Sequence, residues 1–351
     1  MKTNNFIVLL SDYFTSYLPD TRGLSANTIT AYQYAFQLLF EFLMEEKGIS
    51  PEKVNFSVLS EDNLKAYLQW LESKRKCSSA TRNFRRSAIC SFARYSIRKS
   101  KGDTLAFYSA INAIPVKKVP KDTSIRYFTK EEIRLLLNIP NKITAIGKRD
   151  TVLMSVLYAS GARAQELCDL KVNDVSFGQT TNLRLLGKGN KKRLVTLPEN
   201  CASLLKKYIE NRGLDPNSPQ DRSKHVFSSQ THEKMSVSCV EAIVKKYIKK
   251  AKNMYPDMFL QDKYSPHSFR HSIAVHMLEC GESLVVIKAF LGHESISTTT
   301  IYTSVTPELA NKYLRERGTA LDGICAKTMS GTHQALSALP FLKKVYKKQT
   351  I

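Results

Sequence analysis

Four short segments between residues 160 and 302 carry side chains that can bind an anion or transfer a proton. Their polar residues, in chain order, are Arg163, Lys188, His267, Arg270, His293 and Tyr302. An arginine guanidinium is a permanently charged planar fork that suits the oxygens of a phosphate or a carboxylate. Histidine and lysine can move protons. A tyrosine phenol has an ordinary pKa of about 10 and becomes a nucleophile only beside cations and a proton acceptor.

The spacing within these segments is a weaker signal than the residue types. His267 and Arg270 are three residues apart and would share one face of a helix, but any helix can contain such a pair. Lys188 lies between two glycines in the basic turn 187–192, where a solvated lysine is the usual explanation. The segments therefore indicate a function only in combination and through their order along the chain.

The first 112 residues show the 3.6-residue apolar period of amphipathic helices. Four helices are expected, at about residues 6–17, 29–43, 60–71 and 79–99. Ser60 is placed to cap the third of them. These residues are predicted to form one small helical domain.

The fourth expected helix carries Arg82, Arg85 and Arg86, which share one of its faces. That face is predicted to lie along the phosphates of a nucleic acid, and the alternative is a solvated basic surface. Residues 113–123 follow, with two prolines and no apolar period, and are interpreted as a linker between domains.

The second domain is expected over residues 124–318. Thr129 and Glu132 form a capping box at the start of a helix. Three strands are predicted at residues 174–177, 182–186 and 193–197, and helices resume at about residue 200. The predicted fold class is therefore mainly α, with a four-helix N-terminal domain and a C-terminal helical domain that contains one small antiparallel sheet.

Composition narrows the choice of partners. The chain of 351 residues has 53 Lys and Arg against 31 Asp and Glu, a formal charge of +22 with pI ≈ 9.6, which indicates a polyanionic partner. No apolar run is long enough to span a membrane, and the first residues do not read as a signal peptide, so we expect a cytoplasmic protein. Seven cysteines without a C-x-x-C pair do not indicate a zinc site.

In this order and with these neighbours, the segments resemble the catalytic domain of the tyrosine recombinases, the integrase family that includes Xer-type and phage integrases. The matching motifs are Gly-Ala-Arg-x-x-Glu-Leu, Gly-Lys-Gly, His-x-x-Arg and Leu-Gly-His followed by Tyr302. Residues 24–32 and 80–83 resemble the core-binding domain of the same family, so the resemblance covers about residues 5–318. Ala162 and Phe269 depart from the usual pattern, and neither removes a functional group.

The resemblance implies a role for each matched residue in breaking a DNA phosphodiester. Arg163 and Arg270 would stabilise the pentacoordinate transition state, and Tyr302 would attack to form a 3′-phosphotyrosyl link. His267 is the candidate proton acceptor, His293 would donate a hydrogen bond to the phosphate, and Lys188 would protonate the leaving 5′ oxygen. No ATP site, metal site or other cofactor is expected.

Three further side chains are assigned supporting roles at this stage. Glu166 is expected to orient Arg163 or a histidine rather than to act as a base. His271 and His276 are interpreted as structural or as supports for their neighbours.

Lys191 and Lys192, in the basic turn, are predicted to contact DNA together with the three arginines named above.

The same resemblance implies the partners. They would be double-stranded DNA with inverted half-sites, a second protomer on each site, and two such dimers exchanging strands through a Holliday junction, with a possible accessory DNA-bending or directionality protein. Integration, excision or transposition of a mobile element is the favoured role, and phage lysogeny and the resolution of chromosome dimers stay open because they use the same chemistry. Residues 319–351 form a tail that would dock on a neighbouring protomer through its apolar residues.

Two other functions stay open at this point. A type IB topoisomerase uses a similar set of residues and would relax DNA without pairing two sites. A non-catalytic DNA-binding regulator of the same fold is the other alternative, and the complete set of six residues argues against it. The DNA target is not encoded in any recognisable motif.

Overall fold

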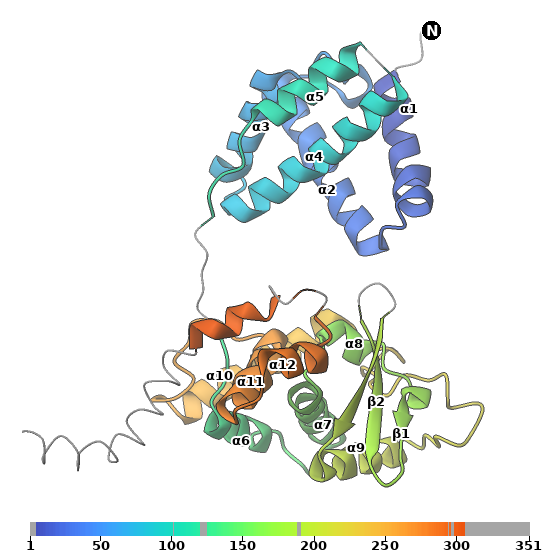
Figure 1. Ribbon diagram of the computed structural model, residues 1–351, viewed down its shortest axis with the longest axis vertical. Helices are drawn as coiled ribbons and strands as arrows, with labels where there is room; N and C mark the ends of the chain where they lie inside the picture. Colours follow the sequence, from blue (N-terminus) through green and yellow to red (C-terminus); the bar gives the residue numbers. More distant parts are fainter. Residues whose placement is uncertain are drawn as a thin grey trace, which may run out of the picture. The chain divides into compact units, whose positions relative to one another are not determined.

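The computed structural model describes residues 5–100, 102–119, 125–187, 191–293, 295 and 298–305. Backbone contacts divide the chain into two compact units, Met1–Asp122 and Thr123–Ile351. Figure 1 shows helices throughout the first unit and a small sheet beside helices in the second. The mainly helical fold class predicted from the sequence is confirmed.

The first unit is a helical bundle in which serines cap the main helices. Its elements are α1 (Asn5–Asp12), the π-helical segment η1 (Tyr13–Thr21), α2 (Ala26–Lys47), the short turn η2 (Pro51–Lys53), α3 (Glu61–Ser73), α4 (Ser79–Lys99) and α5 (Asp103–Ala113). Ser25, Ser60 and Ser78 each accept a hydrogen bond from the backbone N–H three residues on. Helix α5 is additional to the helices that the apolar period indicated.

Aromatic rings fill the centre of this bundle. Phe92 of α4 packs against Phe6, Phe36 and Phe107, with ring centroids 5.6, 5.4 and 6.0 Å away. Large aromatic side chains contribute much of the apolar area that a small helical domain can bury. The core therefore joins α1, α2, α4 and α5.

The arginines of α4 are held by the unit's own backbone. Arg82 is only 6% exposed and donates to the carbonyl of Pro115 at 3.0 Å. Arg85 donates to the carbonyl of Ala31 at 2.9 Å, and its guanidinium lies over the ring of Tyr34. The sequence predicted that these arginines share one helix face that binds phosphates. In the structure, their guanidinium groups donate hydrogen bonds to backbone carbonyls of the same unit.

Arg86, the third of these residues, makes the most ties. Its guanidinium donates to the carbonyls of Ile114 at 2.7 Å and Ile111 at 3.1 Å. These carbonyls belong to the C-terminal end of α5 and the residue that follows it, where helical carbonyls lack partners of their own. Arg86 therefore caps α5 from a neighbouring helix, and a DNA contact by Arg82, Arg85 or Arg86 stays a prediction.

The second unit places helices around one central helix. Its helices are α6 (Lys130–Asn138), α7 (Ala145–Ser160), α8 (Ala164–Cys168), α9 (Glu199–Asn211), α10 (Val237–Met254), α11 (Pro266–Glu279) and α12 (Leu284–Leu291), with the 3-10 turns η3 (Val172–Asp174) and η6 (Thr300–Val305). The capping box of Thr129 and Glu132 begins α6 as predicted. Helix α7 is buried along most of its length and packs against α9 and α11.

The sheet is a three-stranded antiparallel meander of β1 (Val175–Ser176), β2 (Thr181–Leu186) and β3 (Lys192–Leu197). Leu183 pairs with Val195, and both side chains are buried. Figure 1 shows the sheet on one side of this unit and α10–α12 on the other. Within the described ranges, no helix is long and apolar enough to cross a membrane.

Candidate active site

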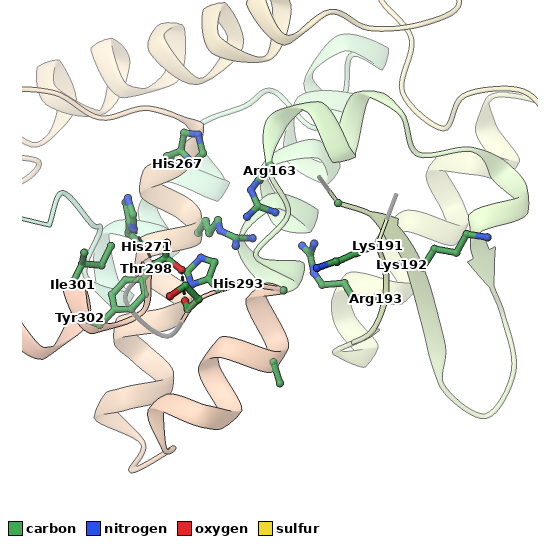
Figure 2. A pocket seen from close by; sticks show the side chains of 15 residues that line it. Arg163, Lys191, Lys192, Arg193, His267, His271, His293, Thr298, Ile301 and Tyr302 are labelled. Atoms are coloured by element: carbon green, nitrogen blue, oxygen red, sulfur yellow. Dashed lines mark hydrogen bonds between the residues drawn. The ribbon is translucent and has the colours of Figure 1, made fainter. Parts of the chain in front are cut away.

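A cavity of about 910 Å³ opens between the β2–β3 hairpin and helices α11 and α12. It brings together five of the six residues singled out in the sequence: Arg163, His267, Arg270, His293 and Tyr302. Figure 2 shows the hairpin residues on one side of this cavity and His271 with Tyr302 on the other. Lys188, the sixth residue, lies outside the described residues, and its neighbour Gly187 lines the cavity.

Arg163 stands at the junction between α7 and α8. Gly161 ends α7 in the left-handed conformation, with φ 58, and a side chain there would clash with Leu291, whose Cδ2 lies 2.9 Å from the position of a Cβ. Glu166 accepts hydrogen bonds from the backbone N–H of Arg163 at 2.9 Å and from its Nη1 at 2.7 Å. The guanidinium is thereby aimed into the cavity with part of it open to an incoming ligand.

Arg270 projects from α11 into the same space and is only 3% exposed. It donates to the carbonyls of Gly161 at 2.6 Å and Leu291 at 2.7 Å. Burial, together with the nearby charges of Arg163 and Arg193, lowers the pKa of Arg270 to about 10. Such crowding of cations is what a site built for an anion requires.

Glu166 is the carboxylate that holds these cations together. It is 4% exposed, and its two oxygens accept from Arg193 at 2.9 and 2.8 Å as well as from Arg163. Burial alone would raise the pKa of Glu166, but the bonds to Arg193 and Arg163 outweigh it and hold the pKa below its ordinary value. The orienting role predicted for Glu166 therefore has a geometric basis.

Arg193 is a member of the site that the sequence analysis did not assign. It lies in β3 and lines the cavity, and a Cβ added at Gly292 would lie only 3.0 Å from the Cδ of Arg193. The signal was present, because Arg193 ends the basic stretch Gly-Lys-Gly-Asn-Lys-Lys-Arg. Only the fold shows that it pairs with Glu166.

The three histidines of the cavity differ in their partners. His271 Nδ1 lies 3.1 Å from the phenolic oxygen of Tyr302, and His293 Nδ1 lies 2.9 Å from Thr299 Oγ1. Burial and the neighbouring charges lower the pKa of both rings to about 4, so both are neutral near pH 7. The contact of His271 with Tyr302 was not anticipated, since the sequence indicated only a structural or supporting role for His271.

His267 faces the arginines rather than the phenol. Its ring is exposed at the cavity, and partial desolvation followed by the charges of Arg270 and Arg163 lowers its pKa. His276, further along α11, bonds to Tyr158 at 2.9 Å and does not line this cavity.

Tyr302 borders the cavity from η6, although its side chain has 0% solvent exposure. Its ring packs against a cluster that includes Ala274, Val275 and Ile287. Burial raises the pKa of Tyr302 to about 12, although the charges of Arg270 and Arg163 act in the opposite direction. The resting phenol is therefore neutral, and it needs a proton acceptor before it can act as a nucleophile.

The basic turn adds charge at the cavity rim. Lys191 and Lys192 are both exposed and line the cavity beside Arg193 (Figure 2). Among the described residues, no group of three or more His, Cys, Asp or Glu side chains is arranged to hold a metal ion.

Comparison with known proteins places this chain in a family. The phage integrase family matches residues 126–308, and the N-terminal SAM-like domain of phage integrases matches residues 12–100. The chain belongs to the phage integrase family, whose members are the tyrosine recombinases. The resemblance identified in the sequence is thereby confirmed.

Individual relatives agree with this assignment. The tyrosine recombinase XerD of Proteus mirabilis is 33% identical over 290 residues, which cover 82% of this chain and 85% of the relative. The tyrosine recombinase XerC of Leptospira interrogans is 29% identical over 308 residues, covering 86% and 91%. The crystal structure of the XerH site-specific recombinase bound to a palindromic difH substrate shares the fold, with a TM-score of 0.62, 21% identity and 89% coverage of each chain.

Proposed function

We propose that this protein is a site-specific DNA recombinase that cleaves and rejoins double-stranded DNA through a 3′-phosphotyrosyl intermediate. One observation carries the proposal: Arg163 and Arg270 converge on a cavity that Tyr302 also borders. Two guanidinium groups can bind the non-bridging oxygens of a phosphodiester and stabilise the charge that develops on them. Family membership adds that relatives with this fold are recombinases.

The proposed cleavage step balances without an external energy source. The Tyr302 oxygen forms a bond to phosphorus, the bond from phosphorus to the 5′ oxygen breaks, and the phenolic proton passes to a histidine. Lys188 supplies a proton to the leaving 5′ oxygen, and His293 donates a hydrogen bond to the phosphate. The phosphotyrosine link keeps the energy of the phosphodiester, so a 5′ hydroxyl can attack it and rejoin the strand without ATP or a metal ion.

We extend the proposal to the assembly. The net charge of +22 suits a protein that surrounds duplex DNA, and Lys191 and Lys192 at the cavity rim would contact the DNA backbone. Protomers would pair on inverted half-sites and exchange strands through a Holliday junction, with integration, excision or transposition of a mobile element as the role. Residues 319–351, which lie outside the described residues, would dock on a neighbouring protomer.

The experiment that tests the function is the capture of covalent adducts. Wild-type protein and Tyr302→Phe would be expressed in cells, the DNA recovered under denaturing conditions, and the attached fragments sequenced. We expect adducts from wild type only, clustered at paired inverted half-sites. A variant without the phenolic oxygen keeps the ring packing of Tyr302, so a loss of adducts is chemical rather than structural.

Other outcomes distinguish the alternatives. Adducts spread over the genome, with relaxation of supercoiled plasmid lacking a special site, would indicate a topoisomerase. Binding to DNA without adducts from either protein would indicate a non-catalytic regulator. Equal adducts from both proteins would show that Tyr302 is not the nucleophile.

A further inference from the structure

The phenolic oxygen of Tyr302 has a histidine within hydrogen-bond distance, and it is not the histidine that the sequence indicated. The ring atom Nδ1 of His271 lies 3.1 Å from that oxygen. The two rings meet edge to face, with centroids 5.8 Å apart and planes inclined by 62°. His267, one helical turn earlier, lies near the arginines, and its ring centroid is 6.4 Å from that of His271.

We propose that His271 is a catalytic residue that accepts the phenolic proton of Tyr302 as the phenol attacks phosphorus. This inference rests on the proposed recombinase function and deepens it, because it separates the roles of the two histidines of α11. His267 faces the phosphate-binding arginines, whereas His271 faces the nucleophile.

The protonation state of His271 suits this role. A neutral imidazole has one donor and one acceptor nitrogen, and the phenol can donate to Nδ1 when the ring proton is on Nε2. Burial, followed by the charges of His267 and Arg270, keeps the His271 pKa near 4, so the ring is free to accept a proton at neutral pH. A ring that carried a proton already could not take another.

The placement of His271 in the fold also fits. It follows Arg270 directly in α11, so one helix carries a phosphate-binding group and the proton acceptor at adjacent positions. His271 and Tyr302 both line the cavity, so a phosphate bound at the arginines can approach the phenol while His271 keeps its contact. The titratable and charged groups around the ring are His267 and Arg270 of α11, Tyr302 of η6, and His293 after α12.

A phosphate bound at the arginines explains how His271 can hold the proton. Once a phosphate anion neutralises the cations beside it, protonated His271 is no longer opposed by the same uncompensated charge. The acceptor thus becomes more basic when substrate is bound, at the moment when the proton must leave the phenol. A bare arginine cluster would resist that transfer.

The test uses DNA duplexes recovered from the wild-type adducts, with a nick that traps the cleaved product. Single-turnover cleavage by the full chain would be measured from pH 5.5 to 9 for wild type, His271→Ala, His271→Asn and His267→Asn. Asparagine can still accept a hydrogen bond but cannot take a proton at these pH values. We expect His271→Ala and His271→Asn to cleave about 10²–10⁴-fold more slowly than wild type at pH 7.

The pH profile separates proton transfer from packing. In both His271 variants the rate should rise about tenfold per pH unit, because the phenol must then ionise to solvent, whereas wild type and His267→Asn should stay nearly flat above pH 6. A fluorinated tyrosine at position 302, with a more acidic phenol, should restore cleavage in His271→Ala more than it changes wild type.

Three results would overturn the inference. The first is a wild-type cleavage rate in His271→Ala. The second is a wild-type cleavage rate in His271→Asn, which cannot accept a proton. The third is a rate that rises with pH in His267→Asn and not in the His271 variants. In each case adducts from wild type would leave the recombinase function standing. A wild-type protein that forms no adduct would instead reject the recombinase function itself.

Discussion

The arginines of α4 and the arginines of the cavity have the same side chain and the same kind of partner, yet they do different work. In α4, Arg82 and Arg86 donate to the carbonyls of Pro115 and Ile114. In the cavity, Arg270 also donates to two carbonyls, those of Gly161 and Leu291. Hydrogen bonds to backbone carbonyls therefore do not distinguish an arginine that ties the fold together from one that is proposed to bind phosphate.

The difference lies in what surrounds each guanidinium. Around the cavity, Arg163 and Arg193 share one carboxylate, that of Glu166, and border an open space together with Arg270. The charge of the cluster is incompletely neutralised, and an anion can reach it. The arginines of α4 instead fix a neighbouring chain segment. Crowding of like charges beside a cavity is thus the feature that distinguishes the proposed anion site from the arginines of α4.

The sharpest test of this comparison is the cleavage rate after substitution of Arg163 or Arg270, where we expect the largest effect. Arg163→Ala or Arg270→Ala should slow cleavage about 100-fold or more, because removing one transition-state donor costs roughly 2.7–4 kcal/mol. Single-turnover cleavage of a nicked duplex measures the change. Wild-type rates in either variant would remove the cavity arginines from the mechanism.

Substitution of Arg193 should have an intermediate effect on the cleavage rate, because it loosens the attachment of the β2–β3 hairpin. Its paired bonds to Glu166 tie β3 to Arg163, and losing such charge-assisted bonds costs roughly 1.5–3 kcal/mol, so Arg193→Ala should cleave about 10- to 100-fold more slowly. Lys188, the proposed proton donor, lies between β2 and β3 in the sequence, so we expect the loss of Arg193 to act through it. A substrate with sulfur at the leaving 5′ position, which needs no protonation, should then restore most of the rate.

Arg163→Ala is the matched control for this measurement. It acts on the phosphate rather than on the leaving group, so the sulfur substrate should not rescue it. Equal rescue of Arg163→Ala and Arg193→Ala by the sulfur substrate would show that Arg193 does not act on the leaving group through the hairpin.

In the first unit the expected effect is on stability. Arg86→Ala removes the ties to Ile111 and Ile114 and should lower the free energy of unfolding of this unit by about 1–3 kcal/mol. Trp70, the single tryptophan, is buried in α3, so its fluorescence during urea unfolding reports this unit. Arg98→Ala, at the exposed end of the same helix, is the control and should change the midpoint little.

The smallest effect is a difference in acid sensitivity between the two units. His271 and His293 have pKa values near 4 when folded, below the unfolded value of about 6.5, so the stability they confer is complete above pH 6.5 and is lost as the pH falls toward 4. Between pH 7.5 and 5.5 each of these two histidines should lower the free energy of unfolding of the second unit by on the order of 1 kcal/mol.

Residues 1–122 contain no histidine, which makes the first unit an internal reference. Urea unfolding followed by Trp70 fluorescence should therefore shift little over this pH range, whereas circular dichroism of the whole chain should show a destabilised transition. A shift of the Trp70 signal as large as that of the second unit would show that the histidines are not its cause.

Local features of both units could be predicted from the sequence alone. The serine cap of α3, the capping box of α6 and the β2–β3 hairpin depend on residues within a few positions of one another. The residue types of the cavity were predicted for the same reason, because motifs along the chain name their members. The neighbours of those residues in space were not.

The sequence by itself determined which side chains are present and which short elements carry them. Only the tertiary structure decided that Arg193 pairs with Glu166, 27 residues away, and that His271 rather than His267 meets Tyr302, 31 residues away. It also decided that Arg86 reaches a carbonyl 28 residues along the chain. A cation or a histidine can serve equally well as surface, support or catalyst, and its role depends on long-range packing that no local pattern encodes.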